Sequence, residues 1–152
     1  MLYMARRFKD AVVQIRQTLT MEDRAPTILT SLALCYLQLG QVSDAYRALQ
    51  RAFTAIGQHR AAARAGAYAE TPERDLGLAL LEALEAEPIR VAWLNAQVAV
   101  QLGERDRALQ WLELGYRERE GEMVLVGADP GFGPLRADPR FQDLQRRIGG
   151  LG

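Results

Sequence analysis

Apolar residues along this chain recur at spacings of three and four positions, which is typical of amphipathic helices. The clearest run follows Gly40, where small and large apolar side chains alternate and polar residues lie between them. At helical spacing the apolar side chains share one face, where small residues let a neighbouring helix approach and large ones fill the gaps. The pattern therefore predicts a packed helix with an inner face of Ala45, Leu49, Ala52 and Phe53.

The same pattern recurs 63 residues later, after Gly103. An apolar helical run precedes each glycine, "TILTSLALCYLQL" in one case and "VAWLNAQVAVQL" in the other. Because glycine adopts the left-handed conformation that ends many helices at little cost, each glycine predicts a helix stop and a short turn. The repeated pattern therefore predicts two hairpins of antiparallel helices. In the second hairpin, the helix after Gly103 has an inner face of Ala108, Leu112, Gly115 and Tyr116.

Two further segments fit the pattern, one before the first hairpin and one between the two. The segment between them lacks the turn glycine, and its first helix is expected in the alanine-rich stretch near residues 59–69. The inner positions are Ala11, Ile15, Thr18 and Leu19 in "ARRFKDAVVQIRQTLTM", and Leu76, Leu80, Ala83 and Leu84 in "YAETPERDLGLALLEALEAEP".

Several helix starts carry a residue that is typical of the N-cap position. Ser43 is expected to cap the helix after Gly40, and Thr71 the helix opened by Pro72. Asp138 is expected to cap a last helix opened by Pro139. Serine, threonine and aspartate side chains at the N-cap accept hydrogen bonds from the first backbone amides of a helix. Proline suits the first helical position because it has no backbone N–H that would need a partner there.

The C-terminal stretch is expected to cover the end of the helical array. A repeat array exposes its last apolar face unless another element lies over it. The last helix has Phe141, Leu144 and Ile148 on one face and is expected to end at Gly149. Before this helix, an irregular segment marked by Asp129-Pro130, Phe132 and Leu135 is expected to fold over the end of the array.

Tyr36, Gly40, Ala45 and Ala52, with Leu32 and Leu49 between them, resemble the tetratricopeptide repeat (TPR) family, whose unit is about 34 residues of helix, turn and helix. Gly103, Ala108, Leu112 and Pro88 also fit. Leu29 departs from the family's early tryptophan and Gly57 from its terminal proline. The resemblance covers residues 1 to about 120 and implies an all-α, right-handed superhelix (α-solenoid) of antiparallel helix hairpins with a C-terminal capping helix. It implies one domain, residues 1–152, divided into 1–25 (partial repeat), 26–57, 58–88 (divergent repeat), 89–120 and 121–152 (cap).

In TPR arrays the first helix of each unit lines a concave groove, so the resemblance also implies a partner-binding surface. Thr30 and Leu34 stand where chaperone-binding members carry the basic and asparagine residues that hold a C-terminal carboxylate, so that subclass is not expected. The mixture of amides, hydroxyls and apolar groups suits an extended peptide or a helix. Trp93 is the best anchor candidate, with core packing as the alternative. The implied lining is Thr27, Thr30, Leu34, Leu37 and Gln38, then Ala61, Ala65 and Tyr68, then Arg90, Trp93, Gln97, Val100 and Gln101.

Composition and isolated reactive residues give no sign of catalysis. The 19 basic and 19 acidic residues balance, which disfavours nucleic-acid binding, and the lone Cys35 excludes a disulfide or a thiolate metal site within one chain. His59 has no second ligand at metal spacing, and "GADPGFG" lacks the lysine of a phosphate loop. Glu82, Glu85 and Glu87 fit a solvated helix face. Trp111 fits core or inter-repeat packing better than a ligand platform. We expect no enzyme activity, no metal and no cofactor.

The N-terminal helix raises the question of partners. Met1 falls partway into the first helix of the first unit, so the second helix of that unit lacks a full partner. The apolar stripe of this second helix, through Phe8, Val12 and Ile15, is therefore expected to be uncovered on one side. Either the chain is part of a longer array, or this edge meets another protein or a second copy. No apolar run is long enough for a membrane span or a signal peptide, so the chain is expected to be cytoplasmic and away from membranes.

The combined expectation is a noncatalytic scaffold that binds an unidentified protein or peptide segment in a groove. A different reading stays open. The C-terminal sequence is similar to the ends of TPR regions in bacterial multidomain proteins, where repeats follow a kinase, a nucleotide cyclase or a DNA-binding regulator domain. The alternative is therefore a sensory or regulatory domain that controls such an attached domain through ligand or partner binding.

Overall fold

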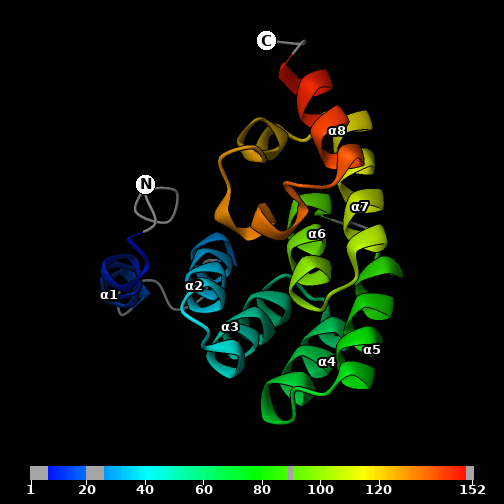
Figure 1. Cartoon of the computed structure of the whole chain (residues 1–152). Coiled ribbons are helices and arrows are strands. Elements are labelled where there is room, and N and C mark those ends of the chain that lie inside the picture. The colour runs from blue at the N-terminus through cyan, green and yellow to red at the C-terminus, as the bar shows by residue number, and fades with distance from the viewer. Residues whose placement is uncertain (1–6, 20–25, 89–90, 150–152) are drawn as a thin grey trace. The chain divides into compact units, whose positions relative to one another are not determined.

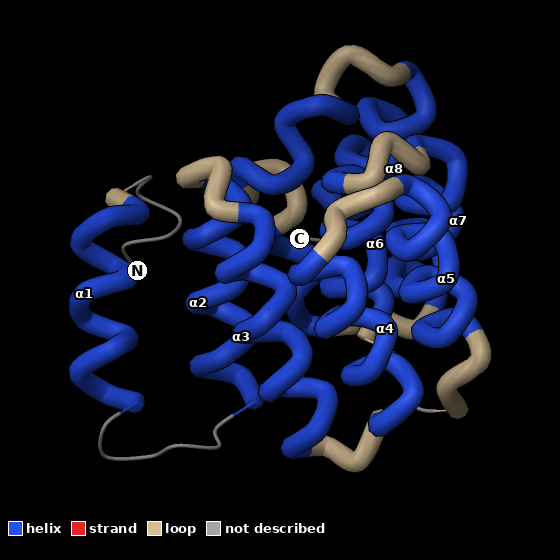
Figure 2. Tube along the Cα trace, turned by 90° about the horizontal axis from the view of Figure 1, so that it is seen from below, coloured by secondary structure: helices blue, strands red, loops and turns tan. Residues whose placement is uncertain are grey.

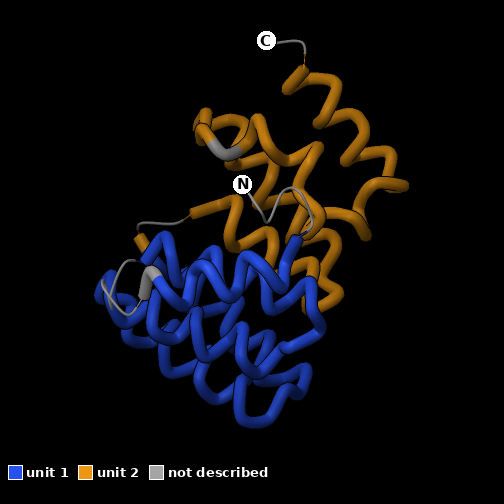
Figure 3. Tube along the Cα trace, turned by 90° about the vertical axis from the view of Figure 1, so that its left-hand side faces the viewer, with its two compact units in different colours: residues 1–87 blue, residues 88–152 orange. Residues whose placement is uncertain are grey.

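The computed structural model describes residues 7–19, 26–88 and 91–149 (Figure 1). Within these ranges all regular structure is helical, so the expected all-α class is confirmed there. Arrangement of the helices in a right-handed superhelix stays a prediction. The chain divides into two compact units, residues 1–87 and residues 88–152 (Figure 3). None of the helices described is long and apolar enough for a membrane crossing.

Unit 1 is a series of helices that pack against their neighbours in sequence: α1 on α2, α2 on α3, α3 on α4, and α4 on α5 (Figure 2). From α2 to α5 this order follows from the apolar pattern, because each short turn returns the chain beside the helix it has just left. The helices are α1 (Phe8–Leu19), α2 (Pro26–Gln38), α3 (Val42–Ala55), α4 (His59–Glu70) and α5 (Arg74–Glu85).

The inner faces predicted for unit 1 are confirmed where the structure describes them. On α3 the four predicted side chains are all buried. On α5, Leu80, Ala83 and Leu84 are buried and Leu76 is partly so. On α1, Ala11 and Val12 are buried and Ile15 is half-buried, whereas the side chains predicted at positions 18 and 19 lie outside the described part.

Unit 2 is a helix hairpin covered by irregular turns and a last helix. The hairpin consists of α6 (Ala92–Gln101) and α7 (Arg105–Arg117). Two 3₁₀ turns follow, η1 (Gly121–Leu125) and η2 (Pro130–Leu135), and then α8 (Pro139–Gly149). The turn η2 packs on α6, whereas η1 packs on α7 and α8, and α8 packs on α7. The expected irregular cover and last helix are therefore present in unit 2.

The core of unit 2 combines the predicted hairpin residues with aromatic rings from the C-terminal stretch. Trp111 is buried, in agreement with the packing interpretation. Phe132 of η2 and Phe141 of α8 are fully buried, with ring centroids 6.3 Å apart. A Cβ at Gly115 would lie 2.8 Å from the Met123 sulfur and 3.3 Å from the Cβ of Ala92, so glycine lets these side chains pack close to α7. The apolar cover thus builds one core with the hairpin.

The predicted turns form at both repeated glycines, and the same turn occurs at a third. The φ values of Gly40, Gly57 and Gly103 are 75°, 81° and 78°. At Gly40, the glycine amide donates to the Leu37 carbonyl (3.1 Å) and the next amide, of Gln41, donates to the Tyr36 carbonyl (2.9 Å). This pair of bonds is the Schellman motif, which satisfies carbonyls left open at a helix end. The other two glycines make equivalent pairs.

Two of the three predicted N-caps are wrong. Ser43 lies inside α3, whose cap is Gln41, because the Schellman turn leads straight into the next helix and its last residue already holds the cap position. Thr71 instead ends α4, through its amide bond to the Ala67 carbonyl, and α5 begins only at Arg74. The third prediction is confirmed: the carboxylate of Asp138 accepts the Arg140 amide at 2.9 Å at the start of α8.

Candidate interaction surfaces

The predicted surface residues of α2 differ in how much they are exposed. Thr27 is exposed, and Thr30, Leu37 and Gln38 are half-buried. Leu34 is only 3% exposed and belongs to the core of unit 1. A partner on this helix could therefore contact the two threonines, Leu37 and Gln38, with little direct contact to Leu34.

The predicted residues of α4 lie in the interior of unit 1. Ala61 and Ala65 are fully buried and Tyr68 is 6% exposed. The Tyr68 ring meets Tyr46 of α3 edge to face, with centroids 4.6 Å apart. Edge-to-face contact is a favourable geometry for aromatic pairs. Burial together with the neighbouring Tyr68 raises the pKa of Tyr46 well above its ordinary value, so this phenol stays neutral.

The predicted residues of α6 include one that sequence reasoning did not expect to be covered. Trp93, Val100 and Gln101 are half-buried, whereas Gln97 is only 3% exposed. The indole Nε1 of Trp93 is inaccessible and has no hydrogen-bond acceptor within the described part of the chain. The predicted Arg90 lies outside the described residues.

The segment that contains η2 packs on α6 and lies beside it, in orange, in Figure 1. Gln97 is covered by this segment. Its Nε2 donates to Oδ2 of Asp129 at 2.7 Å, and Oδ1 of the same carboxylate accepts the Gly131 amide at 2.8 Å. A Cβ on Gly131 would lie 1.8 Å from Oε1 of Gln97, so a side chain at this position would displace the Gln97 amide from its bond to Asp129. Arg136 supports the segment by donating to the carbonyls of Gly127 (2.7 Å) and Asp129 (3.3 Å).

Glu120 caps the start of α6 from the far end of the hairpin. Its carboxylate accepts the backbone amides of Ala92 (3.2 Å) and Trp93 (3.3 Å). A negative charge at a helix N-terminus is favourable because the first amides there have no partner within the helix. Sequence reasoning missed this role, although antiparallel packing predicts that the end of α7 returns to the start of α6.

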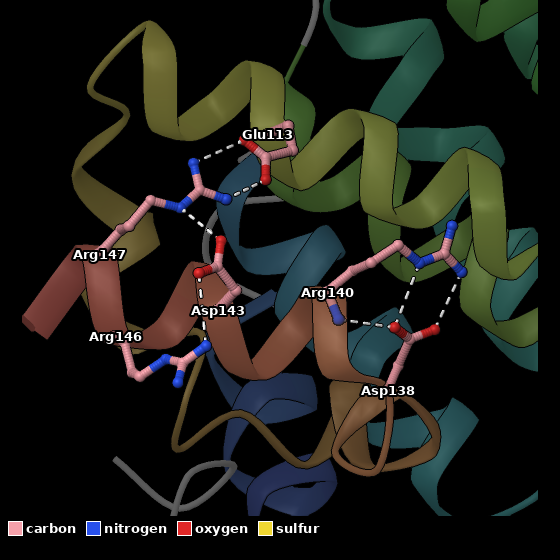
Figure 4. Close-up of polar contacts among 6 residues, drawn as sticks. All are labelled: Glu113, Asp138, Arg140, Asp143, Arg146 and Arg147. Atoms are coloured by element: carbon pink, nitrogen blue, oxygen red, sulfur yellow. Dashed lines mark hydrogen bonds and ion pairs between the residues drawn. The ribbon is translucent and has the colours of Figure 1, made fainter.

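Arginines of α8 attach this helix to α7 (Figure 4). Arg147 makes a two-pronged contact with the Glu113 carboxylate, and its Nε donates to Asp143 at 3.0 Å. Its guanidinium carbon also lies 5.2 Å from the centroid of the Tyr116 ring. These contacts hold α8 against α7 within unit 2.

At the start of α8, Arg140 joins two carboxylates from different elements. Its guanidinium donates to Asp138 at 3.0 Å and lies 2.9 Å from an oxygen of Asp106 on α7. The side-chain hydrogen bonds from Arg140 lower the pKa of Asp138, and the same bonds raise the pKa of Arg140. The pair therefore stays ionised at neutral pH.

The reactive residues singled out in the sequence are in environments without evident chemistry. Cys35 is fully buried, and burial raises the pKa of its thiol to about 11. His59 is exposed at the first position of α4. No three His, Cys, Asp or Glu residues of the described part are grouped so that they could hold a metal ion.

One hollow lies on unit 1, at the N-terminal end of α1. It is open to solvent, has a volume of about 390 Å³ and is lined by Arg7, Phe8, Lys9, Asp10 and Leu39. Arg7 and Asp10 pair with each other across 2.8 Å. None of the predicted groove residues lines it.

In the part of the chain that the structure describes, unit 1 is therefore a series of helices packed in sequence, and unit 2 is a helix hairpin with the Gln97–Asp129 contact under its C-terminal cover. Comparisons of the chain with protein-family models, with curated proteins and with solved structures find no significant match.

Proposed function

We propose that this protein is a noncatalytic scaffold that binds a peptide or protein segment through the first helices of a TPR-like array. The observation that carries the proposal is the repetition of one turn, with the same hydrogen bonds and positive φ, at Gly40, Gly57 and Gly103. Hairpins that follow one another through identical turns are the building plan of repeat proteins, which present extended binding surfaces.

In this proposal α2 supplies the most accessible contacts. Thr27 and Thr30 offer hydroxyl groups, Gln38 an amide, and Leu37 an apolar surface between them. Such a mixture can hold a peptide backbone by hydrogen bonds and one of its side chains by apolar contact. Since buried packing by α1 and α3 holds α2 in place, little ordering entropy is lost when a partner binds.

The test is comparative capture with matched variants. Thr27→Arg and Gln38→Arg place a bulky charge on the proposed surface, whereas Thr54→Arg places the same charge at an exposed position of α3. Partners are cross-linked to each variant and quantified by mass spectrometry. We expect at least one protein to be captured by the wild type and by Thr54→Arg but lost from both α2 variants. Identical capture by all four proteins would contradict the proposal.

A further inference from the structure

The α6 face that the repeat pattern assigns to partner binding is already occupied by the chain itself. The occupant is the segment Gly127–Arg136, called here the cover segment. It lies on α6 through the bond between Gln97 and Asp129 and through the backbone of Gly131, where a Cβ would displace the Gln97 amide from its present position. Asp129 has no exposed surface, so this polar contact is shielded from water.

The chemistry of this contact is specific rather than merely apolar. By the repeat of 63 residues, Gln97 corresponds to Leu34 of α2, and both are 3% exposed. Hairpin packing therefore accepts leucine at this position, and it does not by itself require an amide. Gln97 is matched instead to the carboxylate that lies over it. A buried polar pair of this kind favours one partner chemistry over others, because any other occupant leaves the amide unsatisfied.

From these observations we propose that α6 carries a recognition site for a turn of the form Asp-Pro-Gly-Phe, which the cover segment fills in the resting protein. An external partner with a carboxylate, a glycine two residues later and then an aromatic ring would compete for the same place. The Asp129 carboxylate meets Gln97, Gly131 permits close approach, and Phe132 fills the apolar core. The proposal rests on the proposed function, since it takes the α6 face to be a binding face.

In this proposal the cover segment leaves α6 to admit a partner. Its regular structure is a single short 3₁₀ turn, and such turns are less stable than an α-helix. Its tethered ends hold it near α6 at an effective concentration of about millimolar, so a free turn of the same sequence cannot displace it easily. Release of the cover segment is thus required before a partner binds α6.

The test uses a labelled peptide with the sequence of residues 126–138 as the probe. Gly131→Ala in the protein adds a Cβ that collides with the Gln97 amide, which loosens the cover segment, while the peptide still carries glycine and fits. We expect fluorescence anisotropy to show binding at least about tenfold tighter than to the wild type. Gly133→Ala is the matched control, because a Cβ there meets nothing within 4 Å; this variant should bind as weakly as the wild type.

A double variant tests the recognition chemistry. Gln97→Ala combined with Gly131→Ala removes the amide that meets the carboxylate of the peptide, so peptide binding should fall at least about tenfold below that of Gly131→Ala alone. Peptide binding that is equal in all variants, with circular dichroism unchanged, would overturn the proposal.

A measurement on the wild type does not depend on any variant being folded. If the cover segment is releasable, the amides of Gly131 and Phe132 exchange with deuterium at least about tenfold faster than those in the middle of α6 and α7. If the amides of Gly131 and Phe132 exchange as slowly as those in the middle of α6 and α7, the cover segment is a fixed part of the core, and the proposal is overturned. The scaffold function would survive that result, since the capture test on α2 is independent of it.

Discussion

At the scale of single residues, one backbone conformation recurs at the ends of α2, α3, α6 and α7. Glycine provides it at the first three, whereas Arg119 adopts it after α7 with φ 57°. The amides of Arg119 and Glu120 bond to the carbonyls of Tyr116 (3.2 Å) and Gly115 (3.0 Å), as in the other Schellman turns. The left-handed conformation costs about 1–2 kcal/mol for a residue with a Cβ, so these positions have a measurable effect on stability.

Replacement of Gly103 by alanine should therefore destabilise the α6–α7 hairpin. A Cβ at Gly103 meets no atom within 4 Å, so the effect comes from φ alone. We expect a loss of about 1 kcal/mol in the free energy of unfolding, measured by urea denaturation. The control is Gly133→Ala, which changes a glycine without positive φ and should have a smaller effect. Equal losses in both variants would contradict the explanation.

The opposite substitution at the remaining turn should stabilise the protein. Arg119→Gly relieves the left-handed strain at an exposed position, and part of the gain is offset by the extra freedom of glycine in the unfolded chain. We expect a net increase of about 0.5–1 kcal/mol in the same urea measurement. Arg117→Gly, inside the last turn of α7, is the comparison and should destabilise instead.

Residues whose role depends on local geometry were predictable, and residues with distant partners were not. The Gly40 and Gly103 turns and the Asp138 cap involve bonds within a few positions, so their sequence pattern is sufficient. Ser43 and Thr71 are residue types that often cap helices, but the cap positions of α3 and α5 are held by Gln41 and Glu73. The sequence pattern alone does not show which residue of a turn takes the cap position. Glu120 and Gln97 depend on partners 28 and 32 positions away, which only the packed hairpin and its cover bring close.

At the scale of elements, α8 shows how a helix with an apolar stripe is fixed in orientation by charges. Phe141 and Leu144 supply the buried face, as the spacing predicted. Arg140 near one end and Arg147 near the other bind carboxylates of α7, Asp106 and Glu113. Exposed ion pairs add little stability individually, so their main effect is on the orientation of the helix.

The cap of α8 should make stability sensitive to acid. Because the pKa of Asp138 is lower in the folded state than its ordinary value of 3.8, its stabilising effect is complete above that value. It is lost as the pH falls through the lowered pKa. Asp138→Asn can still accept the Arg140 amide but carries no charge. We expect the difference in unfolding free energy between wild type and variant to be constant near neutral pH and to shrink below pH 3.8. A difference independent of pH would exclude this role of the charge.

At the scale of the whole molecule, two units each have a core of their own. The sequence predicted the hairpins, because their apolar periodicity is local. Its division of one domain into repeats, one of which ends at Pro88, stays a prediction. Organisation as one TPR-like domain, with a common groove, stays a prediction. Periodicity identifies the inner face of each helix, but does not determine how successive units are placed.

Core truncation in one unit tests whether the two are energetically separate. Leu49 is fully buried in α3, and Leu49→Ala should reduce the stability of unit 1 by about 2–5 kcal/mol. If each unit unfolds by itself, hydrogen exchange accelerates in α2, α3 and α4 while α6 and α7 keep their protection. Leu112→Ala in α7 is the reciprocal change. Equal acceleration throughout the chain would show a single cooperative domain.

The carboxylate of Glu120 has a consequence for the order of folding. It joins the end of α7 to the first amides of α6, so the hairpin is closed at its open end as well as at the Gly103 turn. Every contact needed for this closure spans at most 28 positions, and short-range contacts form fast. We therefore expect the hairpin to act as the nucleus of unit 2, on which the later residues of the chain then condense.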